Sequence, residues 1–161
     1  MEITQIISPC LWYDGQAESA AEFYLAAFPN SHIDNVMKSD GDWPGGKAGD
    51  TILVSFSIAG QQFQALNGGP NVPFNEAVSL SIACKDQAEV DRYWDALIAD
   101  GGEAIQCGWL KDKYGLHWQV VPTVLMEMMQ DKNRVKANRA IGAMMQMVKL
   151  DIAALKRAYD G

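Results

Sequence analysis

Short segments in which apolar and polar residues alternate are the main pattern of this 161-residue sequence. Residues 51–58 alternate in this way, and a second alternating segment at 61–66 follows the dipeptide Ala59-Gly60. Two such segments joined by two residues predict a β-hairpin. The same alternation predicts further strands at residues 3–13, 31–38, 77–84, 103–109 and 116–121.

Apolar residues at helical spacing predict the helices. Residues 18–28 carry a broad apolar face. Asp86 stands where it can cap a second helix, and Glu89 follows three residues later, as in a capping box. After Pro122 we expect one helix over 123–130 and then a single longer helix. The apolar stripe of this longer helix consists of Ile141, Met144, Met145, Val148, Ile152, Leu155 and Tyr159.

The two halves of the chain repeat the same order of elements. Gln16-Ala17-Glu18 near the start of the first helix recurs as Gln87-Ala88-Glu89 in the second. An internal duplication explains this agreement. The predicted fold class is α+β, with two βαβββ modules that form a curled antiparallel sheet cleft with helices outside, plus C-terminal helices. The modules are placed at residues 1–70 and 71–122, followed by a helical extension at 123–161, within one compact domain overall.

Composition and charge narrow the possible partners. Apolar residues make up 48% and charged residues 20% of the chain, as in ordinary globular proteins. The net charge of −7 leaves no basic surface for nucleic acid or an anionic membrane. No apolar run is long enough to span a bilayer. Three separated cysteines without a signal peptide favour the cytoplasm, and no Cys/His cluster suggests structural zinc.

The segment at residues 107–122 concentrates aromatic and reactive side chains, and we expect it to form part of a pocket wall. Strand alternation places Trp118 in the core, whereas Trp109 is assigned to the pocket rim. Gln119 is either a polar pocket residue or hydrogen-bonded within the sheet. His117 is either a general base, since histidine titrates near neutral pH, or a hydrogen-bonded structural residue.

Two further features each allow two interpretations. Cys10 and Cys107 are nucleophiles if a positive environment lowers their pKa, and otherwise small buried apolar residues. Residues 41–48 match the spacing of a phosphate-binding P-loop, except that Ala48 replaces the Ser or Thr that would hold magnesium. A P-loop leads into a helix, whereas a strand is predicted next, so we favour a mobile glycine-rich loop near the cleft. His32 is predicted to lie at the surface.

Several motifs spread over the first three-quarters of the chain carry a family resemblance. They are Leu11-Trp12-Tyr13-Asp14-Gly15 with Glu22-Phe23-Tyr24, Ala65-Leu66-Asn67-Gly68-Gly69-Pro70, Ser79-Leu80-Ser81, Cys107-Gly108-Trp109-Leu110-Lys111-Asp112, Tyr114-Gly115-Leu116 and Trp118-Gln119-Val120-Val121-Pro122. The chain resembles the vicinal oxygen chelate superfamily of glyoxalases, extradiol dioxygenases and bleomycin- or fosfomycin-resistance proteins. It resembles most closely the PhnB-like branch, whose domain is often labelled 3-demethylubiquinone-9 3-methyltransferase.

The resemblance implies a ligand cleft and, in the superfamily's enzymes, a divalent metal held by two side chains from each module. The matching positions are Ser8, Pro9 or Cys10, then Gln64 to Asn67, then Ala77 or Ser79, and finally Gln119. No His or carboxylate occupies them, so we predict no metal site and no cofactor. The methyltransferase label also lacks the glycine-rich turn and parallel repeats of a Rossmann-type enzyme.

The predicted function is binding of a small, partly apolar or aromatic molecule in a metal-free cleft, with no reaction assigned. The predicted ligand-binding residues are Cys10, Trp12, Asn67, Ser79, Cys107, Trp109, His117 and Gln119. The alternatives are a metal-dependent lyase or isomerase, a methyltransferase, and a structural dimer module without a ligand. Because superfamily members commonly pair, and because the Met-rich tail suits a core or a subunit interface, we expect a homodimer.

Overall fold

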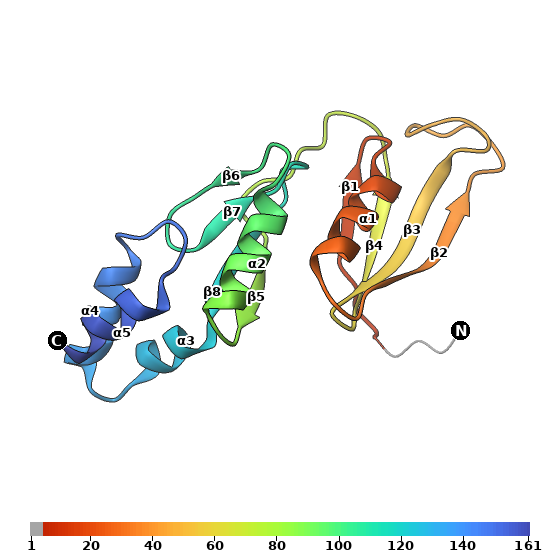
Figure 1. The fold of residues 1–161 in the computed structure, drawn as a ribbon. Helices are drawn as coiled ribbons and strands as arrows, with labels where there is room; N and C mark the ends of the chain where they lie inside the picture. Colours follow the sequence, from red (N-terminus) through yellow and green to blue (C-terminus); the bar gives the residue numbers. More distant parts are fainter. Residues whose placement is uncertain (1–4) are drawn as a thin grey trace. The chain divides into compact units, whose positions relative to one another are not determined.

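The computed structural model describes residues 5–161, which fall into two compact units with the boundary between Pro73 and Phe74. Each unit has a sheet with a helix on one face (Figure 1). The first contains β1 (Cys10–Tyr13), α1 (Ala17–Ala27), β2 (His32–Lys38), β3 (Thr51–Ile58) and β4 (Gln61–Asn67). The second contains β5 (Ser79–Cys84), α2 (Gln87–Ile98), β6 (Glu103–Ala104), β7 (Trp109–Lys111), β8 (His117–Pro122), α3 (Thr123–Gln130), α4 (Arg134–Met144) and α5 (Ile152–Asp160).

Both sheets have the same topology, in the orders β1-β4-β3-β2 and β5-β8-β7-β6. This agreement fits the predicted duplication, and the α+β class is confirmed. The sheets are mixed rather than wholly antiparallel, because β1 runs parallel to β4 and β5 runs parallel to β8. A parallel pair needs a long crossover connection, and the intervening helix and strands provide it in each unit.

The first core forms where α1 packs small side chains onto its sheet. Ala20 and Ala21 are fully buried, which lets the helix approach the strands closely. Tyr24 stacks on Phe56 with 6.4 Å between ring centroids, and Phe56 stacks on Phe63 at 5.7 Å. These contacts cover only one face of the first sheet.

The first strand begins later than the alternation predicted. Ile3 lies outside the described residues, and Ile7 is 84% exposed rather than packed in the sheet. Pro9 has no N–H to donate to a strand ladder. Before it, the side-chain amide of Gln5 replaces backbone pairing, because it both donates to and accepts from the backbone of Gln62, each at 3.1 Å.

The predicted hairpin between β3 and β4 is confirmed, with Ile58 opposite Gln61. Ala59 and Gly60 both have positive φ, at 50° and 82°. This conformation is that of a type I′ turn, whose twist matches that of the flanking strands.

The strand predicted at residues 103–109 is interrupted in the structure. Residues 105–108 form a loop between β6 and β7, in which Cys107 and Gly108 have φ values of 61° and 82°. Their N–H groups bond to carbonyls of the C-terminal extension instead of continuing the ladder. A tertiary contact therefore overrides the local strand pattern.

The C-terminal extension contains three helices. The helix at 123–130 is confirmed, but the single longer helix is wrong, because residues 145–151 separate α4 from α5. Asp151 begins α5 anew by accepting a hydrogen bond from the N–H of Ala154 at 3.0 Å. The extension has its own apolar cluster, formed by Leu125, Met128, Ala140, Leu150 and Leu155.

The predicted cap of α2 is confirmed. The Asp86 carboxylate accepts from the N–H of Glu89 at 2.9 Å. The Glu89 carboxylate reaches back to the N–H of Lys85, also at 2.9 Å, one residue before the position that a standard capping box uses.

Candidate functional site

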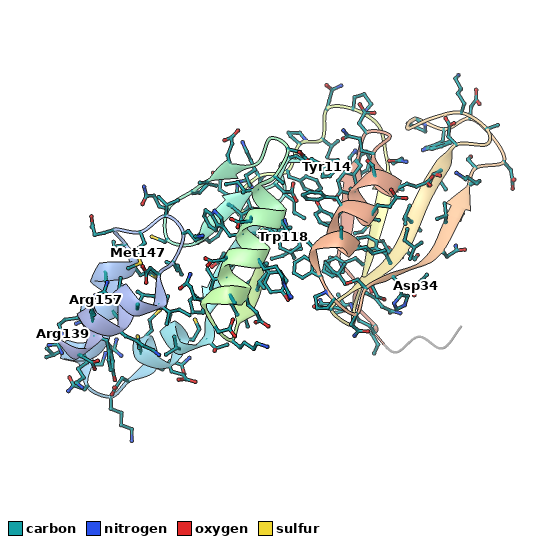
Figure 2. All side chains as sticks on the ribbon, in the orientation of Figure 1. Asp34, Tyr114, Trp118, Arg139, Met147 and Arg157 are labelled. Atoms are coloured by element: carbon teal, nitrogen blue, oxygen red, sulfur yellow. The ribbon has the colours of Figure 1, made fainter. Side chains whose placement is uncertain are left out.

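The second sheet presents a polar face on the side away from α2. The other side is apolar, since Leu110, Trp118 and Val120 are buried and their strands contact α2. Trp118, labelled in Figure 2, is therefore a core residue, as predicted. Strand alternation puts eight residues of β5, β7 and β8 on the opposite side, of which Ala83 and Val121 are apolar. We call the part of this side formed by the other six residues the second polar face, and it consists of Ser79, Ser81, Trp109, Lys111, His117 and Gln119.

Strand register brings four predicted ligand residues together on the second polar face. Ser79 lies opposite His117, and Gln119 lies opposite Trp109. The Gln119 amide donates from Nε2 to Ser79 Oγ at 2.9 Å. This bond fixes the orientation of the amide within the sheet. Gln119 is half-buried, and its Oε1 can still accept a hydrogen bond from a ligand. The structure is therefore compatible with both interpretations of Gln119.

His117 is not fully hydrogen-bonded, unlike the structural histidine that was one of its two interpretations. It is 7% exposed, and its Nδ1 has no hydrogen-bond partner among residues 5–161. A buried polar atom left unpaired costs about 1–3 kcal/mol. A ligand or a bound water could supply the hydrogen bond that this nitrogen lacks.

Cys10 and Trp12 lie on the corresponding face of the first sheet. Cys10 is opposite Gln64, and Trp12 is opposite Leu66. The Trp12 indole donates from Nε1 to the carbonyl of Gly69 at 2.8 Å, and its ring occupies the space where a side chain at Gly68 would lie. The loop after β4 therefore fixes the orientation of this indole.

Asn67 and Cys107 lie apart from these two faces. Asn67 is buried on the helix side of the first sheet, where Oδ1 accepts from the N–H of Ala17 and Nδ2 donates to the carbonyl of Thr51, both at 2.9 Å. It supplies the helix cap that Gln16 does not. Cys107 is half-buried in the loop before β7.

Cys10 and Cys84 show no sign of nucleophile activation. All three cysteines are free, and Cys10 is exposed rather than a buried apolar residue. Desolvation raises the pKa of the Cys10 thiol, and burial raises the pKa of the Cys84 thiol to about 11. Both thiols are therefore protonated at neutral pH, which disfavours attack on a substrate.

The donor set does not fit a metal site of the glyoxalase type. Gln64 and Gln119 take equivalent places in the two sheets, each opposite the parallel edge strand at Cys10 or Ser81. Besides these amides the second polar face offers hydroxyls and the single imidazole of His117, whereas zinc, nickel and iron sites need several imidazole, thiolate or carboxylate ligands. Across the part of the chain that the structure describes, no three His, Cys, Asp or Glu side chains cluster to hold a metal.

Asp112 is the structural residue that the sequence interpretation missed. Its carboxylate is 1% exposed and accepts from the backbone N–H groups of Tyr114 and Leu116, at 2.9 and 3.1 Å. The Trp118 indole donates to its other oxygen at 2.9 Å. The signal was an Asp at the start of a turn closed by Gly115, where Asp commonly bonds to the backbone ahead of it.

The glycine-rich segment at 41–48 is not a P-loop. It leads into β3, as predicted, and the N–H groups of Lys47 and Ala48 bond to the carboxylates of Asp50 and Asp42. These N–H groups are therefore unavailable to a phosphate. The Trp43 indole ties the loop to the carbonyl of Asn67 at 2.9 Å.

This loop borders a polar pocket of about 390 Å³ in the first unit, which contains a charged cluster. The Glu18 carboxylate accepts hydrogen bonds from Thr51 and from Lys38 Nζ. These bonds, that of Thr51 first, lower the pKa of Glu18 from its ordinary value of 4.5. The ionised form is thus favoured in the folded state.

Glu18→Gln is expected to reduce stability at neutral pH but not in acid. A lowered folded-state pKa contributes stability above the ordinary pKa, and this contribution is lost as the pH falls through the folded-state pKa. Urea unfolding measured from about pH 7 to about pH 3 should show the two proteins converging below the ordinary value of 4.5. Glu22→Gln, at an exposed site on the same helix, is the control. A constant difference at every pH would contradict this assignment.

Fold and site together describe an α+β protein with two βαβββ units, as in the glyoxalase fold, and with no cluster of three possible metal ligands among residues 5–161. The model of the family described as 3-demethylubiquinone-9 3-methyltransferase matches residues 5–121, and the chain belongs to this family. No curated protein matches. No helix among residues 5–161 is long and apolar enough to cross a membrane.

Solved structures support the same assignment. A PhnB protein from Bacillus cereus with the same methyltransferase description is 32% identical, with a TM-score of 0.66, over 73% of this chain and 99% of its own. A Pseudomonas aeruginosa protein is 19% identical, with a TM-score of 0.59, over 74% and 98%. A fosfomycin resistance protein from Listeria monocytogenes is 18% identical, with a TM-score of 0.54, over 81% and 100%. The last two show a shared fold.

Proposed function

We propose that this protein binds a small, partly aromatic molecule without a metal, and that the second polar face carries the main contacts. The observation that supports this most is that an oriented amide, Gln119, and an imidazole with an unpaired buried nitrogen, His117, lie on the same side of one strand. Gln119 is held by Ser79, while the buried Nδ1 of His117, two residues away on the same side of β8, has no partner among residues 5–161.

The chemistry of this face suggests what the ligand offers. Trp109 supplies an aromatic surface opposite Gln119. Gln119 Oε1 accepts a hydrogen bond, so a ligand with an N–H or O–H group beside an aromatic ring matches the pair. The charge of Lys111 is balanced by Glu103, whose carboxylate lies 3.0 Å from its Nζ, so a strongly anionic ligand is not required.

The family description does not translate into a methyltransferase mechanism here. A Rossmann-type enzyme binds its nucleotide cofactor at the carboxyl ends of a doubly wound parallel sheet. Both sheets of this chain are mixed and four-stranded. Binding without an assigned reaction is therefore the function we propose.

A cytoplasmic homodimer completes the proposal. The extension exposes several apolar side chains, among them Met126, Val135 and Met145, at 47%, 67% and 59%. Exposed apolar residues of this kind suit a subunit contact. Analytical ultracentrifugation giving only monomer at micromolar concentration would remove the dimer from the proposal.

A thermal-shift screen of small aromatic compounds tests ligand binding. A ligand that binds only the folded state raises the melting temperature in a saturable way. We expect at least one such compound for the wild type, and a loss of its effect in Gln119→Ala. Gln61→Ala, at an exposed position on the first sheet, should retain the shift. A screen without any saturable compound would favour the structural dimer module instead.

A further inference from the structure

The C-terminal extension lies beyond the family match, which ends at residue 121, just before α3. Its role therefore has to be derived from its own contacts. The segment between α4 and α5, residues 145–151, contacts both the loop before β7 and helix α2, and we call it the strap. Met147, labelled in Figure 2, lies in it.

The strap is hydrogen-bonded to the loop at residues 105–108, which separates β6 from β7. The consecutive N–H groups of Cys107 and Gly108 donate to the carbonyls of Met147 and Val148, both at 2.8 Å. These are the two residues that take positive φ between β6 and β7. The strap thus provides the partners that the sheet itself does not give to this loop.

Gly108 is also hydrogen-bonded to β8. Its carbonyl accepts from the N–H of Val120 at 2.8 Å, directly beside Gln119. A Cβ at Gly108 would lie 2.9 Å from Leu150 Cδ1, so only glycine lets the strap approach this closely. Leu150 is 1% exposed, and its side chain fills the space over Gly108.

The other side of the strap is fixed to α2. The Gln87 side chain donates to the carbonyl of Leu150 at 3.1 Å and accepts from the N–H of Ile152 at 2.9 Å. Lys149 Nζ lies 2.9 Å from an Asp91 carboxylate oxygen. The strap therefore connects α2, on one side of the second sheet, to the loop at residues 105–108. This loop leads into β7 and is hydrogen-bonded to β8 through Gly108.

We propose that the strap positions the β7–β8 hairpin, with Leu150 and Gln87 as positioning residues, and that the extension thereby sets the geometry of Trp109 and Gln119. The consequence for ligand binding rests on the proposed function. The mechanical claim does not, because it concerns the backbone of the hairpin in the free protein.

Amide hydrogen exchange of the full chain, followed by NMR, tests the strap. Leu150→Ala is expected to open the contact between the strap and the loop at residues 105–108. Exchange at the amides of Cys107, Gly108 and Val120 should then become faster by a factor on the order of tenfold larger than at the amides that pair β5 with β8. Leu155→Ala removes an equally buried leucine from the same apolar cluster outside the strap, and it should lack this local pattern.

A milder pair of variants keeps the test valid if Leu150→Ala fails to fold. Lys149→Ala removes the ion pair between the strap and α2, whereas Lys47→Ala removes the exposed Lys47–Asp42 pair of the first unit. Only Lys149→Ala should shift the Trp109 indole N–H signal and speed exchange at Gly108. Equal effects of the two lysine variants, or exchange that rises uniformly through the unit, would overturn the proposal. These results need no ligand, so a failed compound screen leaves them unaffected.

Discussion

Asp112→Ala is expected to destabilise the second unit by about 3–5 kcal/mol, because it leaves several neutral donors without their acceptor and each unsatisfied buried donor costs about 1–3 kcal/mol. The carboxylate accepts three hydrogen bonds, two from the backbone of the turn and one from the Trp118 indole. Alanine would leave all three donors unpaired inside the fold. Urea unfolding followed by circular dichroism measures the loss.

Asp112→Asn keeps the size of the side chain and changes only its charge and hydrogen bonds, so it isolates their contribution to stability. Asparagine keeps an acceptor for the N–H groups of Tyr114 and Leu116 but sets an NH₂ against the Trp118 indole. The loss should therefore be smaller, about 1–3 kcal/mol for one donor left unpaired. Asp112→Ala with near-native stability would show that the carboxylate does not organise the hairpin.

Asn67→Ala is expected to cost the first unit about 2–3 kcal/mol, because two buried groups lose their partners at once. The N–H of Ala17 loses its cap, and the carbonyl of Thr51 loses its donor. Urea unfolding of the first unit measures this effect. The exposed Asn75→Ala is the control for a general effect of removing an asparagine.

The same variant examines the ligand role predicted for Asn67. If this side chain only supports the fold, a compound that stabilises the wild type should stabilise Asn67→Ala by the same temperature increment. Native stability combined with lost ligand response would contradict the structural role and favour direct contact. The ligand role of Asn67 stays a prediction until this is measured.

The sequence predicted the fold well wherever a local pattern decides the structure. The hairpin around Ala59-Gly60, the cap at Asp86 and the helix at 123–130 depend on neighbouring residues, and all three are confirmed. The strand predicted at residues 3–13 is present only as Cys10–Tyr13 among the described residues, and the single long final helix is wrong, because Pro9 and the strap contacts of residues 145–151 act against the apolar pattern.

The candidate site was predictable only in part, for a related reason. Strand alternation puts His117 and Gln119 on one side of β8, and the register places Ser79 opposite His117 on the same side. Alternation cannot show that His117 Nδ1 is buried without a partner or that Asp112 lies in the core, because both depend on how turns fold over the strands. Nor could it show that Asn67 faces α1 and caps it.

Metal analysis of the purified protein tests the central claim of a metal-free binding face most directly. The wild type and Gln119→Ala would be compared after purification without chelator and after incubation with zinc, nickel, iron or manganese. We predict no stoichiometric metal in either protein, because no three His, Cys, Asp or Glu side chains cluster among residues 5–161, and His117 is the only imidazole on the second polar face. Stoichiometric metal in the wild type that is lost in Gln119→Ala would contradict it and favour a metal-dependent lyase or isomerase.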